Sequence, residues 1–293
     1  MIGRRKYLMA TSVVLTGLPI LGTTKAAFAN GKFVDELRRL ERESGGRLGV
    51  TLLDTRNGSR SGRRSDERFP ICSTFKVLLT AAVLRRVDGG QENLARRVRF
   101  GAEAILEHAP VTKTRVGGDG MSLAELCDAT MTFSDNTAAN LLLTTIGGPA
   151  ALTVFVKSLG DDVTRLDRTE PALNEALPGD LRDTTTPNAM ASTLSTLTLG
   201  EALSPASRTQ LVAWLGGSKT GDARLRAGLP RSWRVGERTG TGERGTANNV
   251  AVVWPEGRPP LIVTAYLTEA TVNRTQQSAV LAGVGRAVAA ISA

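Results

Sequence analysis

Hydrophobic spacing in the first part of the chain predicts a helix followed by two strands. Phe33, Leu37 and Leu40 recur at helical intervals, and this periodicity ends at Gly45-Gly46, a typical helix terminus. The segment "RLGVTLLDT" that follows has the composition of a strand. Asn57-Gly58 then predicts a tight turn into a second strand.

The middle of the chain, from about Phe69 to Trp214, has mainly helical periodicity. Ser122-Leu-Ala-Glu125 is a capping box that begins one helix. The segment "DNTAANLLLTTIGG" predicts a second helix ending at Gly147-Gly148, and Pro149 can begin a third. This part of the chain is therefore expected to be helical.

The last part of the chain returns to strand-like patterns. "SWRVGER", "NNVAVVW" and "LIVTAYLT" predict three strands, and a helix is expected from about Val272 to Ile291. Strands at both ends around a helical middle predict an α+β fold, with a sheet built from both termini. We expect an α/β domain with an antiparallel sheet from residues 30–65 and 215–293, and an all-helical domain from residues 66–214.

The first 29 residues predict a signal peptide. Arg4-Arg5-Lys6 forms a basic start, "YLMATSVVLTGLPILG" is a short apolar segment, and Ala27-Phe28-Ala29 is a small-x-small cleavage site. The mature chain is then expected to begin near Asn30, to be exported to the periplasm or the medium, and to have no stable membrane anchor. The two adjacent arginines leave both the general secretory route and the twin-arginine route open.

Composition argues against a nucleic-acid partner. The chain has 293 residues, 41% of them hydrophobic, and a formal net charge of +9. Four of the 37 basic residues and none of the 28 acidic residues lie in the expected leader, so the mature charge falls to +5. The basic residues are scattered, and aromatic residues make up only 4% of the chain, too few for base-stacking platforms.

The cysteine and histidine content argues against a metal site. Cys72 and Cys127 are the only cysteines, and His108 is the only histidine. Three such residues at these spacings do not form a zinc motif, so we expect neither a metal nor another cofactor. Spacing alone leaves open whether the two cysteines form a disulfide.

Ser73 and Lys76, in "CSTFKVLL", are the first candidate catalytic pair. One turn of helix would bring the lysine amine near the serine hydroxyl. The alternative is an ordinary capping serine with a surface lysine. The apolar run from Phe75 to Leu84 argues against that alternative, because an ammonium in a buried helix costs several kcal/mol and requires a reason.

Two further segments carry candidate polar groups. Ser134-Asp135-Asn136 precedes the helix in "NTAANLLL", and its simplest interpretation is a helix cap. The segment "RTEPALN" lacks hydrophobic periodicity and holds Glu170 and Asn174. It predicts a loop that presents a carboxylate and an amide, with an ordinary solvated loop as the alternative.

The glycine-rich segment "GERTGTGERG" matches two different patterns. Gly240 to Gly245 fits G-x-G-x-x-G, the dinucleotide-binding pattern, which requires a helix after the loop. Val250, Val252 and Trp254 alternate with other residues as in a strand instead. The same segment begins with Arg238-Thr239-Gly240, a cation followed by a hydroxyl and a flexible residue.

In this order and spacing, the four segments resemble the class A serine β-lactamases, which carry Ser-x-x-Lys, Ser-Asp-Asn and Lys-Thr-Gly motifs. The resemblance extends over nearly the whole mature chain and implies a β-lactamase/transpeptidase-like fold. It implies that Ser73 is the nucleophile, that Lys76 and Ser134 move protons, and that Glu170 activates the water that removes the acyl group. Whether Lys76 or Glu170 is the base for acylation stays open.

The resemblance also implies the substrate-binding groups and the partners. A small-molecule β-lactam is the expected partner, and the chain is expected to act as a monomer. The backbone N–H groups of Ser73 and Thr241 would form the oxyanion hole. The substrate-binding residues implied are Asn136, Asn174, Arg224, Arg238, Thr239, Gly240, Thr241 and His108.

Several positions differ from the commonest pattern of the family. Arg238 replaces the usual lysine of the third motif, as in the carbenicillin-hydrolysing subgroup, so carboxypenicillins are the expected favoured substrates. Arg224 matches a site where some members carry a compensating arginine. Cys127 matches half of a common disulfide, with Thr80 at the partner position. Arg168 and Asp183 match an ion pair that closes the glutamate loop.

Two alternative functions share part of this signature. The first is a D-alanyl-D-alanine carboxypeptidase or another penicillin-binding protein, which has the serine, the lysine and the third motif but not the glutamate loop. The second is a non-catalytic penicillin sensor, for which a membrane span and a signalling domain would be expected. The segment "EPALN" with Glu170 favours a hydrolase over the first alternative, and neither feature expected of the second is visible in the sequence.

Overall fold

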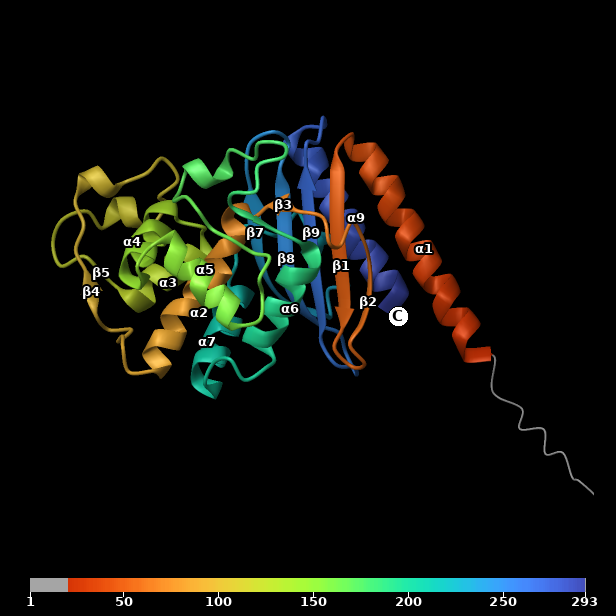
Figure 1. Cartoon of the computed structure of the whole chain (residues 1–293), viewed down its shortest axis with the longest axis horizontal. Helices are drawn as coiled ribbons and strands as arrows, with labels where there is room; N and C mark the ends of the chain where they lie inside the picture. The colour runs from red at the N-terminus through yellow and green to blue at the C-terminus, as the bar shows by residue number, and fades with distance from the viewer. Residues whose placement is uncertain (1–20, 293) are drawn as a thin grey trace, which may run out of the picture.

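The computed structural model describes residues 21–292 and contains a five-stranded antiparallel sheet in the order β2-β1-β9-β8-β7 (Figure 1). Its two N-terminal strands lie beside its three C-terminal strands, which confirms the sheet built from both ends and the α+β class. The strands are β1 (Arg47–Asp54), β2 (Ser59–Arg63), β7 (Arg234–Thr241), β8 (Ala247–Trp254) and β9 (Leu261–Thr268).

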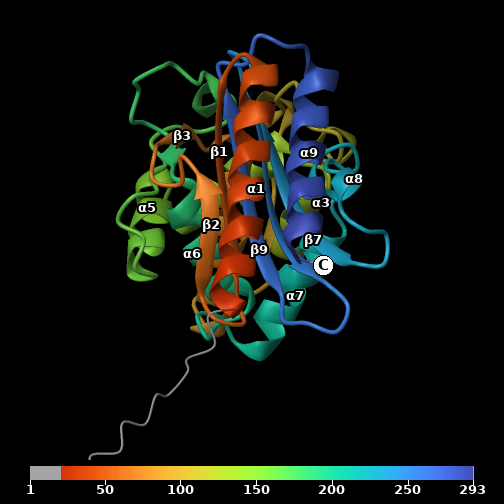
Figure 2. The same cartoon turned by 90° about the vertical axis from the view of Figure 1, so that its right-hand side faces the viewer.

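Both faces of the sheet are covered, so β9 is buried along its whole length. On one face, α1 (Leu21–Ser44) and α9 (Arg274–Ser292) lie side by side (Figure 2). Phe33, Leu37 and Leu40 of α1 are buried there, as their spacing predicts. On the other face, α6 (Pro187–Thr198) packs against the sheet, where the Thr264 hydroxyl donates to the Pro187 carbonyl.

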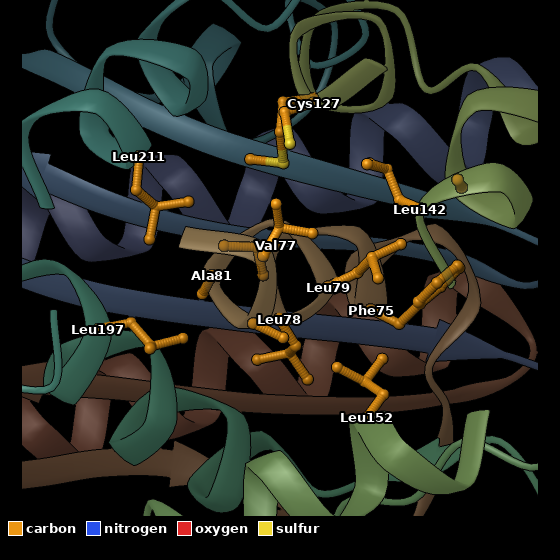
Figure 3. Close-up of a cluster of buried hydrophobic side chains, with 14 of the residues drawn as sticks. Phe75, Val77, Leu78, Leu79, Ala81, Cys127, Leu142, Leu152, Leu197 and Leu211 are labelled. Atoms are coloured by element: carbon orange, nitrogen blue, oxygen red, sulfur yellow. The ribbon is translucent and has the colours of Figure 1, made fainter. Parts of the chain in front are cut away.

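The helical middle of the chain surrounds one central helix. The helices are α2 (Phe75–Asp88), α3 (Leu123–Thr132), α4 (Asn136–Ile146), α5 (Pro149–Ser158), α6 and α7 (Pro205–Gly216), whereas the short α8 (Leu225–Gly228) packs against α9. Leucines of α4, α5, α6 and α7 surround α2, whose Val77, Leu78 and Leu79 are buried (Figure 3). The domain boundaries given above stay a prediction.

The helix ends agree with the local sequence signals. Ser122 and Glu125 form both hydrogen bonds of the capping box of α3. Gly147 ends α4 in a left-handed conformation with φ of 100°, and Pro149 is the first residue of α5. These signals identified the helices correctly because each depends on local backbone geometry.

Four short strands escaped sequence analysis. β3 (Phe69–Pro70) pairs with β6 (Thr184–Thr185), and β4 (Arg97–Val98) pairs with β5 (Met121–Ser122). Two residues are too few to show an alternating pattern, so these pairings depend on the tertiary structure.

The expected leader lies mostly outside the described residues. Its basic start and most of its apolar segment fall within residues 1–20, while the expected cleavage site falls in α1. None of the helices in the described part of the chain is by itself long and apolar enough to cross a membrane. Only α4 and α5 taken together pass that test, and they meet at a bend of 71°.

Candidate active site

Ser73 lies at the N-terminal end of the buried helix α2. It belongs to a 3-10 turn, η1 (Cys72–Thr74), that leads directly into α2. Cys72 has φ of 43°, a strained conformation for a residue with a side chain, and such strain is typical of functional turns. Ser73 is 8% exposed, so its hydroxyl lies in a largely desolvated position at the positive end of a helix dipole.

Lys76 is fully buried, as the apolar run around it predicts. Its ammonium donates to the Ser134 carbonyl at 2.9 Å, to Ser134 Oγ at 3.2 Å and to Asn136 Oδ1 at 2.6 Å. It also lies 3.0 Å from Glu170 Oε1. Burial lowers the pKa of Lys76 to about 8, against the opposing charge of Glu170. Burial thus favours the neutral amine more than water does, so Lys76 can both accept and donate a proton.

Glu170 connects the serine and the lysine. Its Oε1 lies 3.1 Å from Ser73 Oγ and 3.0 Å from Lys76 Nζ. Asn174 Nδ2 donates to Glu170 Oε2 at 2.5 Å. No direct hydrogen bond joins Ser73 to Lys76 in the described part of the chain, so the expected contact between them runs through the carboxylate. Glu170 is 3% exposed and is therefore not a solvated loop residue.

The three residues of Ser134-Asp135-Asn136 have two different structural roles. Asp135 is the cap of α4, since its carboxylate accepts from Ala138 N and also from the backbone N–H and hydroxyl of Thr112. Ser134, with φ of 61°, and Asn136 direct their side chains to Lys76 instead. The simple capping interpretation therefore holds for the aspartate alone.

The loop that carries Glu170 is fixed at both ends. Arg168 Nε donates to Asp183 Oδ2 at 2.6 Å, which confirms the ion pair expected to close it. Asn140 holds Glu170 by its backbone: its side chain donates to the Glu170 carbonyl at 2.9 Å and accepts from the Glu170 N–H at 3.0 Å. This clamp escaped sequence analysis, although a polar residue one turn after Asn136 on a helix with a buried apolar face is a usable signal.

Arg238 of β7 is fully buried, and all five of its N–H donors have protein acceptors. Nη1 donates to the carbonyls of Thr130 at 3.3 Å and Met131 at 2.6 Å, in the last turn of α3. Nη2 donates to the hydroxyls of Thr220 at 2.8 Å and Thr239 at 3.1 Å, and Nε donates to the Thr239 carbonyl at 3.1 Å. Burial lowers the pKa of Arg238 to about 10, so it stays cationic at neutral pH. The direct substrate contact expected from the sequence would require one of these bonds to break.

Arg224 lies against the same strand. Its guanidinium donates to the carbonyls of Gly240 at 2.7 Å and Asn248 at 2.8 Å, and to Thr241 Oγ1 at 2.7 Å. Burial lowers the pKa of Arg224 to about 10, with the nearby Arg274 acting in the same direction. Arg274 itself donates to the Gly242 carbonyl at 3.0 Å. Arg274 was missed, because nothing in the local sequence at the start of α9 indicates that it reaches the turn after β7.

The glycines after Arg238 bring β7 close to the serine turn. A Cβ on Gly240 would lie 3.2 Å from Cys72 Cβ, and one on Gly242 would lie 2.7 Å from Cys72 Sγ and 2.9 Å from the Asn174 carbonyl. The strand β8 follows this segment instead of a helix, so the dinucleotide interpretation is excluded. These glycines therefore lie against the serine turn and the loop that carries Glu170. A side chain at either glycine would push β7 away from Ser73.

His108 lies at the surface, and the two cysteines lie in the core. His108 is exposed, its Nε2 lies 3.2 Å from the Phe133 carbonyl, and its own carbonyl accepts from Asn136 N at 2.9 Å. Cys72 and Cys127 are buried free thiols, and burial raises the pKa of each. Thr80 has a buried hydroxyl without a partner in residues 21–292. No cluster of three or more His, Cys, Asp or Glu suited to a metal occurs in the same residues.

Comparisons with known proteins agree with this geometry. The model of the Beta-lactamase enzyme family matches residues 32–291. The beta-lactamase Toho-1 of Escherichia coli is 46% identical over 276 residues, which cover 94% of each chain. The solved structure of an ancestral class A β-lactamase is 63% identical, with a TM-score of 0.86 over 87% of this chain and 98% of that one. A putative class A β-lactamase, PenP from Rhodopseudomonas palustris, is 60% identical with a TM-score of 0.87 over 88% of this chain and 98% of that one. The chain therefore belongs to the class A β-lactamases, serine enzymes that hydrolyse the amide bond of β-lactams and so confer resistance.

Proposed function

We propose that Ser73 attacks the lactam carbonyl and that its proton passes to the group formed by Lys76 and Glu170. Ser134 then delivers a proton to the departing lactam nitrogen. The four polar side chains form a connected series of contacts, from Ser73 through Glu170 and Lys76 to Ser134, which supports this assignment. We assign the oxyanion hole to the N–H groups of Ser73 and Thr241, since β7 runs beside the serine turn.

Glu170 is the proposed base for removal of the acyl group, and two observations support this proposal. Glu170 Oε1 lies 3.1 Å from Ser73 Oγ, and the neighbouring Asn174 Oδ1 is buried without a protein partner in the described residues. A buried amide oxygen requires a donor, and a water held between this oxygen and the Glu170 carboxylate would supply one. The same water would lie beside the acylated serine. The test of this function is whether the protein turns over benzylpenicillin, measured as the loss of absorbance of the lactam ring.

The proposed range of substrates depends on two cations near β7, Arg238 and Arg224. Asn136 and Asn174 are the proposed polar contacts of the substrate, and Thr239, Gly240 and Thr241 contact it along the strand. Arg238 and Arg224 supply positive charge behind the strand, and His108 borders the cleft. We propose penicillins, with carbenicillin among them, as the favoured substrates of an exported, monomeric enzyme.

Arg238→Lys tests the preference for carbenicillin. Lysine has three donors in place of five and no planar fork, so part of the hydrogen-bonding from β7 to the end of α3 and to the Thr220 and Thr239 hydroxyls is lost. We expect kcat/KM for carbenicillin to fall about tenfold and that for benzylpenicillin about twofold, because carbenicillin carries a second carboxylate. Steady-state kinetics on both substrates measure this. Equal losses for the two penicillins would contradict the proposed preference.

Asn140→Ala tests the clamp on the glutamate loop. Without the two backbone bonds, the Glu170 carboxylate shifts relative to Ser73, and a displacement of about 1 Å can reduce a rate by about 100-fold. We expect kcat to fall by about 10- to 100-fold, with acyl-enzyme present at steady state. Stopped-flow kinetics and mass spectrometry check the two parts. If kcat falls but no acyl-enzyme accumulates, the clamp does not act through deacylation.

A further inference from the structure

Three neighbouring strands of the sheet contribute one row of residues beneath the serine turn. Gly240 of β7 lies opposite Asn248 of β8, and Asn248 lies opposite Tyr266 of β9. Residues that pair directly on neighbouring strands point to the same face of a sheet. This face is the one that meets the serine turn, because the Tyr266 hydroxyl lies 3.2 Å from Thr74 Oγ1. The row therefore offers the turn a glycine, an amide and a hydroxyl.

Asn248 donates to the backbone just before the serine turn. Its side chain is fully buried, and Nδ2 donates to the Pro70 carbonyl at 2.9 Å and to the Ile71 carbonyl at 3.3 Å. Both partners are acceptors, so the amide nitrogen has to face them. Asn248 Oδ1 is then left buried without a partner in residues 21–292. An unsatisfied buried acceptor is destabilising, so stability alone does not explain an asparagine at this position.

The backbone that Asn248 holds leads directly into a strained residue. Ile71 precedes Cys72, whose φ of 43° persists only where the surrounding contacts over-determine it. Ile71 N donates to the Asp183 carbonyl at 2.8 Å, and the Ile71 carbonyl accepts from Thr74 Oγ1 at 2.6 Å. The bond from Asn248 is the third of these contacts and the one that joins Ile71 to the five-stranded sheet.

Asn248 is itself held firmly in its strand. It pairs with residues of β7 on one side and of β9 on the other. Arg224 Nη1 donates to the Asn248 carbonyl at 2.8 Å and to the Gly240 carbonyl at 2.7 Å, which joins the same two strands a second time. A donor on a rigid element of the sheet positions its target more precisely than a donor on a loop does.

We propose that Asn248 is a positioning residue for the nucleophile. By holding Pro70 and Ile71 against β8, it fixes the direction of the Ser73 hydroxyl and of the Ser73 N–H, the proposed donor to the oxyanion. In residues 21–292 its side chain makes no hydrogen bond to Ser73 itself, so it acts on the reaction through the turn. This inference rests on the proposed function and adds a residue to its site.

Asn248→Leu is the central test, because leucine branches at the same carbon as asparagine and cannot donate. We expect kcat/KM for benzylpenicillin to fall about 10- to 100-fold, since a displacement of about 1 Å can reduce a rate by about 100-fold. The melting temperature should change by only a few degrees, because losing the unpaired Oδ1 offsets losing the two donated bonds. Asn248→Ala also removes the donor and decides the question if the leucine variant does not fold. An unchanged kcat/KM, or a loss explained by unfolded protein, would overturn the proposal.

Gln277→Leu is the matched control. Gln277 of α9 is likewise a buried amide, donates through Nε2 to the Val272 carbonyl at 2.9 Å, and has an Oε1 without a partner in the described part of the chain. It differs from Asn248 in holding the segment before α9 instead of the serine turn. We expect its kcat/KM to stay within about twofold of the wild-type value. A loss as large as that of Asn248→Leu would contradict a specific effect on the serine.

Binding without reaction separates positioning of the serine from damage to the substrate site. In Ser73→Ala no acyl bond to the serine can form, so calorimetric titration with benzylpenicillin gives the Kd of binding alone. Adding Asn248→Leu to Ser73→Ala should change this Kd by about twofold or less. A rise in Kd as large as the fall in kcat/KM would show that Asn248 acts on substrate binding, and the proposal would be wrong. If the wild-type protein turns over no penicillin, the proposed function fails; if it does and both Asn248 variants match it, only this inference fails.

Discussion

Replacing Ser73 with alanine is expected to abolish turnover of benzylpenicillin, with a fall in kcat of about 10⁵- to 10⁶-fold. The substitution removes only the hydroxyl group, which is the group that would form the acyl bond. Its loss also removes the 3.1 Å hydrogen bond to Glu170, but Lys76 still lies 3.0 Å from that carboxylate. The charges of the site are therefore retained, and the variant should fold normally. Hydrolysis rates at high enzyme concentration measure the residual activity.

Two control measurements on Ser73→Ala show whether the variant is folded and whether it forms an adduct. Thermal unfolding should give a melting temperature within a few degrees of that of the wild-type protein, because no buried charge loses its partner. Mass spectrometry after mixing with benzylpenicillin should show only the free variant. An adduct on Ser73→Ala, or turnover within tenfold of the wild-type rate, would mean that another residue is the nucleophile.

Replacing Glu170 with alanine is expected to stop the reaction after one equivalent of penicillin. Acylation would continue while deacylation loses its base, which contributes typically 10²- to 10⁴-fold. Mass spectrometry should then show the protein carrying one penicillin. Free enzyme alone at steady state would argue against Glu170 as the deacylating base. A wild-type protein that itself consumed only one equivalent would instead favour the penicillin-binding or sensor alternatives.

Glu170→Gln is the matched control for this experiment. Removing the carboxylate leaves Lys76 buried among neutral acceptors, Ser134 and Asn136, which costs about 3–5 kcal/mol if the charge persists. Glu170 opposes the lowering of the pKa of Lys76 by burial, so its loss lowers that pKa further and favours the neutral amine. Acyl-enzyme in both variants would show that acylation proceeds without Glu170, with Lys76 as base. The Ser73→Ala and Glu170→Ala double variant should carry no adduct.

Local patterns predicted the parts of the fold that depend on local geometry. The helix termini at Ser122, Gly147 and Pro149, the main strands and the burial of Lys76 follow from caps, turns and periodicity. The two-residue strands and the clamp by Asn140 do not, because they join segments distant in the sequence. Helical spacing and the surrounding apolar run singled out Ser73 and Lys76, but the roles of the motif residues come from the resemblance to a family and remain proposals.

Arg238 shows most clearly where sequence alone falls short. Its identity suggested a cation facing the substrate, but its position on β7 directs the guanidinium to the end of α3 and to two hydroxyls. The partners of Arg238 come from three separate elements, which are α3, β7 and the segment between α7 and α8 that carries Thr220. Local sequence does not show how these elements pack together. Thr220 carries no motif, so its contact with Arg238 is visible only in the structure.

The pairing of β1 with β9 determines when the protein can fold. Asp54 pairs with Leu261, and Arg47 pairs with Thr268, so the central strand β9 and its neighbour β1 are separated by more than 200 positions along the chain. A ribosome has to release nearly all of the polypeptide before this sheet can close, and such long-range pairing is slow to form. The N-terminal segment therefore waits, with its apolar face unpaired, until synthesis is almost complete. A protein truncated before β9 should lack all activity, although it retains Ser73, Lys76, Ser134, Glu170 and Arg238.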